Sequence, residues 1–158
     1  MAEITDPTLR AALRTFQVRN GELRKTIEGL GDAGINWIPG TETNSIFAVL
    51  WHAMDVERNS ISNAALNPAT VPPRDLTRKG TEAELLARLA ETEGELESYI
   101  GQISDLNAEV QMYGRTTFAA QVLVNGVSHV TEHAAHAALT RQMWEQYGMS
   151  GVVKGVEA

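Results

Sequence analysis

Apolar residues recur at steps of three and four positions along most of the chain, which is the spacing of helices that bury one face. The first predicted helix begins at Asp6-Pro7, where a capping acid precedes a Pro at the first helical position. The Gly cluster at 29–34 ends it. Asn20 is the polar exception on its inner face, and we interpret it as a register device or a group that lines a cavity. That face carries Leu9, Leu13, Phe16, Asn20, Leu23, Ile27 and Leu30.

The second predicted helix follows the turn at Pro39-Gly40. Thr43 or Asn44 can cap its start, and the apolar pattern carries it to about Asn63. Residues 64–80 hold three Pro and a Gly, which indicates a loop without regular structure. A loop of this length predicts a crossover at the end of a helical bundle, because a tight hairpin needs far fewer residues.

The third predicted helix starts at a capping box formed by Thr81 and Glu84 and reaches about Ile103. A looser stretch with Asn107 and Gly114 follows. The inner face of this helix carries Leu85, Leu89, Thr92, Leu96, Tyr99, Ile103 and Leu106.

The fourth predicted helix starts at Thr116 or Thr117 and extends to about Tyr147. The Gly-rich tail beyond Gly148 is expected to fray. Four amphipathic helices and no convincing strand predict an all-α fold, an antiparallel four-helix bundle. No repeat or internal boundary is evident, so residues 1–158 are predicted to form a single domain.

Composition excludes some classes of partner. The 158 residues carry a net charge of -7 and no dense Lys/Arg run, so binding to nucleic acid or to an anionic membrane is not expected. No apolar stretch approaches the roughly 20 residues of a spanning helix, and no secretory signal is visible. These features favour a cytoplasmic protein. The absence of Cys removes disulfides, Cys-zinc sites and a thiol nucleophile of the chain's own.

The four histidines carry the clearest chemical signal. His129 and His133 lie four positions apart on the predicted inner stripe of the fourth helix, so both imidazoles can reach one metal ion. Gly126, one turn earlier, allows another backbone to come close. The full stripe reads Val122, Gly126, His129, His133, His136, Thr140 and Trp144.

His52 is the only histidine outside this helix, and it shares an inward stripe with Val49 and Val56. A bundle can bring it across to His129 and His133. Three imidazoles with an open position are typical of catalytic zinc and also suit nickel, iron or cobalt. The alternative is a set of ordinary core histidines with an accidental four-residue spacing. Metal is favoured because no thiolate or buried acid cluster competes, and because buried imidazoles without a partner are costly.

Other candidates have less defined roles. His136 is interpreted as a residue beside the ligands or at the pocket, and Asn20 and Trp51 are candidates for the same surroundings. Trp51 can equally be a dimer contact or core, whereas core is expected for Trp144. Asp55 can orient His52, but like Glu132 it is better interpreted as a solvated acid. The HExxH, GxSxG, P-loop and GxGxxG motifs are absent, and no general acid or base is identified.

Two segments carry a family resemblance. The first, INWIPGTETNSIFAVLWHAMDVE, contributes Trp37, Pro39, Ser45, Ile46, Leu50, His52 and Glu57. The second, HVTEHAAHAALTR, contributes His129, His133, His136 and Arg141. Together they resemble the DinB/YfiT-like family of metal-dependent proteins.

The resemblance implies that His52, His129 and His133 are metal ligands. His136 stands where many members of the family have Gln, and Ala135 replaces a usual Gly. The resemblance also implies a homodimer and a bundle whose helices run in up-down-down-up order. This helix order agrees with the long crossover. Relatives use low-molecular-weight thiols such as bacillithiol or mycothiol, as S-transferases or as a thiol-dependent isomerase.

The expected function is therefore a metal-dependent enzyme, and we expect zinc or nickel as its ion. The ion would activate a small thiol for attack on a small-molecule electrophile. Two alternatives remain open: a hydrolase that activates water on the same metal, and a metal-binding stress-response protein without turnover.

Overall fold

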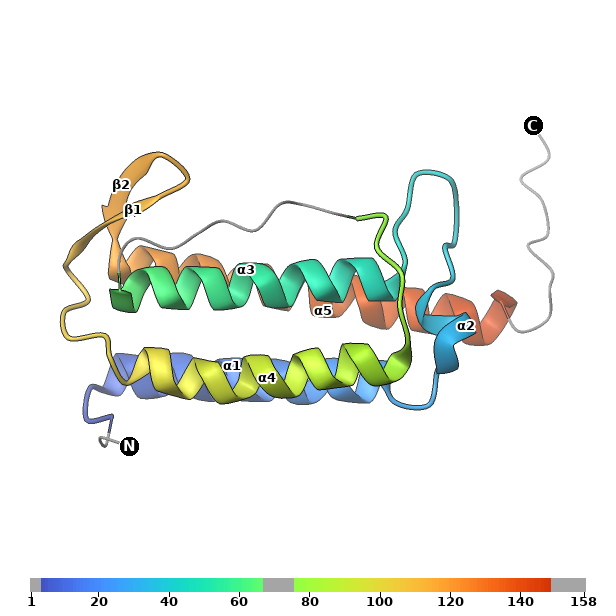
Figure 1. Cartoon of the computed structure of the whole chain (residues 1–158), viewed down its shortest axis with the longest axis horizontal. Coiled ribbons are helices and arrows are strands. Elements are labelled where there is room, and N and C mark those ends of the chain that lie inside the picture. The colour runs from blue at the N-terminus through green and yellow to red at the C-terminus, as the bar shows by residue number, and fades with distance from the viewer. Residues whose placement is uncertain (1–3, 67–75, 149–158) are drawn as a thin grey trace.

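The computed structural model describes residues 4–66 and 76–148, and most of these residues lie in helices (Figure 1). The described elements include four long helices, one short helix, a two-stranded hairpin and a final π-helix. In chain order they are α1 (Pro7–Ile27), α2 (Gly31–Ile35), α3 (Ile46–Leu66), α4 (Glu82–Ile100), β1 (Glu109–Met112), β2 (Arg115–Phe118), α5 (Ala119–Met143) and η1 (Trp144–Gly148).

The long helices bury one shared core. α1 and α3 each pack against both α4 and α5, so every long helix has two long neighbours. The core is built mainly from aliphatic and aromatic side chains, whose removal from water stabilises the fold. Its largest fully buried members are Phe16, Leu23, Ile27, Ile35, Ile46, Phe47, Leu50, Met54, Ile61, Leu85, Leu89 and Leu96. Within the described ranges, no helix combines the length and the apolar character that crossing a bilayer requires.

Helix starts follow the prediction where a side chain caps them. The Asp6 carboxylate accepts hydrogen bonds from the backbone N–H groups of Thr8 and Leu9, at 2.8 and 3.0 Å. At the start of α4, Thr81 and Glu84 form the reciprocal capping box that their spacing predicts.

Several element boundaries differ from the prediction. α2 forms inside the Gly cluster that was expected only to end α1. α3 starts at Ile46, where the Ser45 hydroxyl accepts the Ala48 N–H, rather than after a cap at Thr43 or Asn44. It continues to Leu66, and α4 ends at Ile100. Of the predicted 64–80 loop, residues 64–66 are helical and residues 67–75 lie outside the described residues, as does the tail after Gly148.

The hairpin corrects the expectation that the chain contains no strand. β1 and β2 pair antiparallel, with Glu109 opposite Phe118 and Met112 opposite Arg115. Tyr113 and Gly114 form the turn with φ values of 53° and 74°, the left-handed conformation that two-residue hairpin loops require. The fold is thus mostly helical with a small two-stranded sheet. Thr116 and Thr117 lie in β2, so the fourth long helix starts later than predicted.

Arg141 fixes the C-terminal half of α5 against the end of α1. Its Nη1 donates to the backbone carbonyls of Lys25, Thr26 and Glu28, at 2.7, 3.1 and 3.0 Å. The last carbonyls of a helix have no hydrogen-bond donor within the helix and carry partial negative charge. A guanidinium stabilises them because it supplies both N–H donors and positive charge. Because Arg141 lies two turns beyond His133, this contact also positions the helix that carries the histidines.

Replacing Arg141 by Ala is expected to lower the free energy of unfolding by about 2 kcal/mol, since hydrogen bonds to a charged donor contribute about 1.5–3 kcal/mol. Urea denaturation followed by circular dichroism measures the change. Glu145→Gln is the matched control, because it removes only the exposed Arg141–Glu145 ion pair and should cost less than about 1 kcal/mol. Equal losses in the two variants would contradict the capping role.

Candidate metal centre

The structure brings His52, His129 and His133 together between α3 and α5. His52 lies on the second turn of α3, and the other two occupy successive turns of α5. One ring nitrogen from each residue lies within 4.8 Å of the other two. The ring centroid of His52 is 5.2 Å from that of His129 and 5.5 Å from that of His133. All three side chains are half-buried, so the cluster lies at the edge of the core.

The nitrogen spacing fits a single divalent ion. The Nε2 atoms of His129 and His133 are 3.1 Å apart, and the planes of the two rings are inclined at 71°. Two nitrogens that each lie 2.0–2.1 Å from one tetrahedral zinc are about 3.4 Å from each other, which is close to this distance. The donor chemistry agrees, because neutral imidazoles bind zinc and nickel well. These three residues are therefore able to hold a metal ion.

Gly126 lets α5 lie close to its neighbours one turn before His129. A Cβ at this position would lie 3.4 Å from Phe16 Cζ on α1 and 3.4 Å from Ser60 Cβ on α3. Larger side chains would force these helices away from α5. The nearest atoms belong to side chains and lie at ordinary van der Waals distance, whereas the prediction was that another backbone comes close here.

His136 lies beside the cluster but faces outward. Its ring centroid is 5.8 Å from that of His133, and its side chain is exposed. The expectation that this position belongs to the buried face is wrong, because the buried face of α5 runs through Gly126, Val130, Ala134 and Ala137 instead. Glu132 is exposed, as expected for a solvated acid.

Asn20 is paired in the core with an acid that was not predicted to be buried. Its Nδ2 donates to Oε1 of Glu57 on α3 at 3.3 Å, and the two residues are 0% and 1% exposed. Burial raises the pKa of Glu57 from 4.5 to about 8, although the hydrogen bond from Asn20 acts in the opposite direction. Glu57 is therefore largely protonated at neutral pH. A signal for this contact was available in the sequence, because both residues are polar and lie on the inner faces of two different helices.

Trp51 is covered by cationic side chains. It stacks on Phe47 with ring centroids 5.5 Å apart, and the Arg78 guanidinium carbon lies 3.8 Å from the centroid of its ring. Arg88 of α4 lies 5.4 Å from the same ring. These contacts are cation–π interactions at the face of α3 that meets α4. A role for Trp51 in the metal pocket remains a prediction.

Trp144 packs at the opposite end of α5 from the hairpin. Its ring lies 5.8 Å from that of Trp37, and a Cβ on Gly34 would come within 2.8 Å of its Nε1. Trp144 is half-buried and joins the edge of the core.

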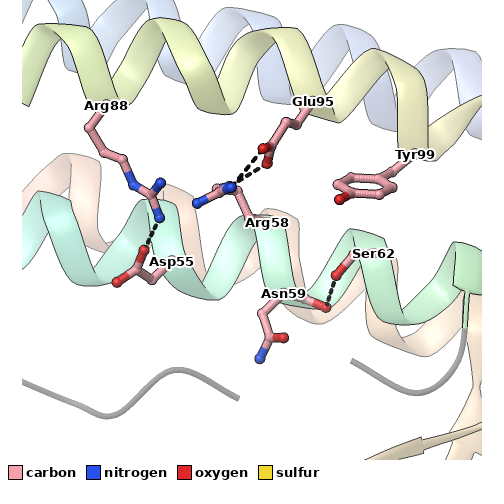
Figure 2. A pocket seen from close by; sticks show the side chains of 7 residues that line it. All are labelled: Asp55, Arg58, Asn59, Ser62, Arg88, Glu95 and Tyr99. Carbon is pink, nitrogen blue, oxygen red and sulfur yellow. Dashed lines mark hydrogen bonds and ion pairs between the residues drawn. The ribbon is translucent and has the colours of Figure 1, made fainter. Parts of the chain in front are cut away.

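A cavity of about 320 Å³ between α3 and α4 is a second candidate site (Figure 2). Arg88 reaches from α4 to Asp55, and Arg58 reaches from α3 to Glu95, where its Nη2 lies 2.6 Å from Oε1. Each guanidinium is thus neutralised by a carboxylate. Asp55 is only 18% exposed, so it is a paired acid rather than a solvated one. The arrangement is best explained as an ion-pair network that joins α3 to α4.

A smaller cavity of about 120 Å³ reaches the histidine cluster itself. It lies where α3, α5 and the hairpin meet. Its lining residues are Val56, Ser60, Met112, Tyr113, Val122, Asn125 and His129. Because His129 belongs both to this cavity and to the three-histidine cluster, a molecule in the cavity would contact one of the three clustered residues.

Comparison with known proteins agrees with this architecture. Residues 15–140 match the family model of the DinB superfamily. The crystal structure of a conserved protein from Enterococcus faecalis has a similar fold, with a TM-score of 0.70 and 16% sequence identity over 90% of this chain and 98% of that one. No curated protein matches the chain. Because the family match spans most of the chain and includes all three clustered histidines, this protein belongs to the DinB superfamily.

Proposed function

We propose that this protein is a divalent-metal-dependent thiol S-transferase, with His52, His129 and His133 as the metal ligands. The observation that carries the proposal is the convergence of three imidazole nitrogens from two helices. Membership of the DinB superfamily supports a metal-dependent function. Zinc or nickel is the proposed ion.

The donor set suits activation of a thiol. A divalent ion held by three neutral imidazoles keeps its full positive charge and lowers the pKa of a thiol that binds to it. With an ion bound, the three histidines would hold that thiol close to the cavity that His129 lines, so part of a substrate can lie in this cavity. The chain has no Cys, so the reacting sulfur belongs to a separate small molecule.

The proposal includes the arrangement of the helices around this site. We propose one domain, a four-helix bundle with up-down-down-up order, that assembles as a homodimer. The chain direction in Figure 1 supports the helix order, because α1 and α5 run one way along the long axis and α3 and α4 run the other way. In this order α3 and α5 are antiparallel neighbours, and both present their histidines to the same interface.

A conjugation assay tests the proposal. The metal-loaded protein is incubated with bacillithiol or mycothiol and with 1-chloro-2,4-dinitrobenzene. In the expected reaction a sulfur–carbon bond forms, the carbon–chlorine bond breaks, and chloride leaves as the thiol proton passes to solvent. We expect a thioether product that forms at least about tenfold faster with metal-loaded than with metal-free protein.

Two other outcomes assign a different function. Metal-dependent cleavage of an ester or amide without added thiol would replace the transferase with a hydrolase. No metal-dependent product with any thiol, electrophile or ester would instead support a metal-binding protein without turnover. Variant His133→Ala serves as the control, because an activity that survives it does not use the histidine cluster.

A further inference from the structure

Two cavities adjoin at the β1–β2 hairpin. The inner one, of about 120 Å³, reaches His129, and the outer one, of about 390 Å³, lies along the hairpin. The outer cavity is lined by Met112, Tyr113, Arg115, Thr116, Thr117 and Asn125. Because Met112, Tyr113 and Asn125 line both, the two spaces share one wall, and a ligand that passes this wall would occupy both.

The inner cavity is suited to an aliphatic group. Its lining residues include the apolar side chains of Val56 on α3, Val122 on α5 and Met112 in the hairpin. A cavity of about 150 Å³ with apolar walls holds a molecule of benzene, so about 120 Å³ holds about four or five carbon atoms. The end of such a group that meets His129 would lie at the three-histidine cluster.

The outer cavity is suited to an anionic group. Arg115, Thr116 and Thr117 of β2 line it, and among its lining residues Arg115 alone carries a charge. No acidic side chain in the described ranges forms an ion pair with this arginine. The chain as a whole carries a net charge of -7, so a positive group here contrasts with the surrounding field.

Tyr113 lies at the wall between the two cavities. Its φ of 53° is left-handed, a conformation in which Asn or Gly is favoured at a two-residue hairpin turn. A Tyr in this place costs conformational energy that an Asn would avoid. Tyr113 is a lining residue of both cavities, so a large side chain stands at the turn where the two cavities meet.

We propose that these cavities form the substrate site for a small anionic molecule with an aliphatic segment of about four or five carbons. The end that binds the metal lies at His129, the aliphatic segment fills the inner cavity, and the anionic group meets Arg115. Tyr113 limits the length of the segment. This inference rests on the proposed function only for the chemistry of the end at His129.

A series of ω-mercaptoalkanoates, from mercaptoacetate to 8-mercaptooctanoate, tests the proposal. Each is titrated into cobalt-loaded protein, and the thiolate-to-cobalt charge-transfer absorption reports binding. Affinity is expected to rise about fourfold with each added methylene, as burial of apolar surface predicts. The rise should stop at about four or five methylenes, where the inner cavity is full.

Variants separate the two cavities. Asn suits the hairpin turn and lacks the aromatic ring, so in Tyr113→Asn the tightest binding should move to longer mercaptoalkanoates. Tyr113→Phe keeps the ring and should leave the preferred chain length unchanged. Arg115→Gln should weaken the mercaptoalkanoates with about four or more methylenes, which are long enough to reach it, by about three- to fivefold, the effect of one exposed ion pair. The shorter acids and the mercaptoalkanols should be unaffected. Lys25→Gln, the matched control, makes the same charge change at an exposed position of α1 and should have no effect.

The outcomes distinguish this inference from the proposed function. The charge-transfer absorption could show that thiols bind with an affinity that is independent of chain length and unchanged in Tyr113→Asn. In that case the proposed substrate site is wrong, and the proposed thiol function stands. Absence of the absorption with every thiol overturns the thiol function. In that case, calorimetry with plain alkanoates of the same lengths tests the cavities alone. The proposed site is then supported if alkanoates of the same chain length bind most tightly and if Tyr113→Asn shifts this optimum to longer chains. An alkanoate affinity that does not depend on chain length would show that the proposed site is wrong.

Discussion

Replacing His52, His129 or His133 by Ala is expected to lower the affinity for zinc or nickel at least about 100-fold. Loss of a residue that only supports a ligand costs about 10–100-fold in metal affinity, and loss of a ligand itself costs more. His52→Ala is the most informative variant, because His52 reaches the cluster from a different helix. Competition with a chromophoric chelator measures the affinity, and metal analysis of untagged protein measures the occupancy.

His136→Ala is the matched control for this prediction. It removes an imidazole from the same helix, close to the cluster but exposed, and should change the metal affinity less than about threefold, well below the loss expected for a ligand. Circular dichroism verifies that each variant is folded. If His52→Ala binds metal like the unmodified protein, the three-residue ligand set is wrong. If His136→Ala loses as much affinity as His133→Ala, His136 is itself a ligand.

Glu57→Gln is expected to stabilise the protein, and the gain should grow with pH. Between pH 4.5 and about 8 the folded protein keeps the Glu57 proton that the unfolded chain has released. The free energy of unfolding therefore falls by about 1.4 kcal/mol for each unit that the pH rises through this window. Gln is neutral throughout, keeps an acceptor for Asn20 and avoids this loss. The variant should be more stable by about 4 kcal/mol at pH 7.5 and about equally stable below pH 4.5.

Urea denaturation at several pH values between 4 and 8 measures this difference, and the slopes of the two proteins against pH are compared. Glu97→Gln is the control, because Glu97 is an exposed acid of α4 and its replacement should leave the slope unchanged. A constant difference between Glu57→Gln and the unmodified protein across the range would show that Glu57 is ionised in the folded state.

The histidine cluster could be anticipated because its geometry is largely local. The four-residue spacing of His129 and His133 alone places both rings on one side of a helix. Placing His52 required only its inward stripe and a neighbouring helix. The partnership of Asn20 with Glu57 could not be anticipated in this way, since these residues lie 37 positions apart and their contact depends on how α1 meets α3.

Element boundaries were predictable where a side chain marks them. Asp6 and Thr81 cap their helices through hydrogen bonds that the sequence pattern reveals. α5 starts after Phe118 without a capping side chain, so no residue signals its start. The hairpin escaped prediction because each strand has only four residues, too few for alternating burial to stand out from helical spacing.

The origin of the three histidines on two helices has a consequence for the lifetime of the protein. An ion held by all three would act as a removable cross-link between α3 and α5, whose segments are far apart in the chain. A ligand that binds only the folded state, at a concentration of 100 times its dissociation constant, adds about 2.7 kcal/mol to the free energy of unfolding. Opening of the helices, and with it degradation by proteases, would then slow as metal becomes abundant, so the supply of the ion would set how long each molecule survives.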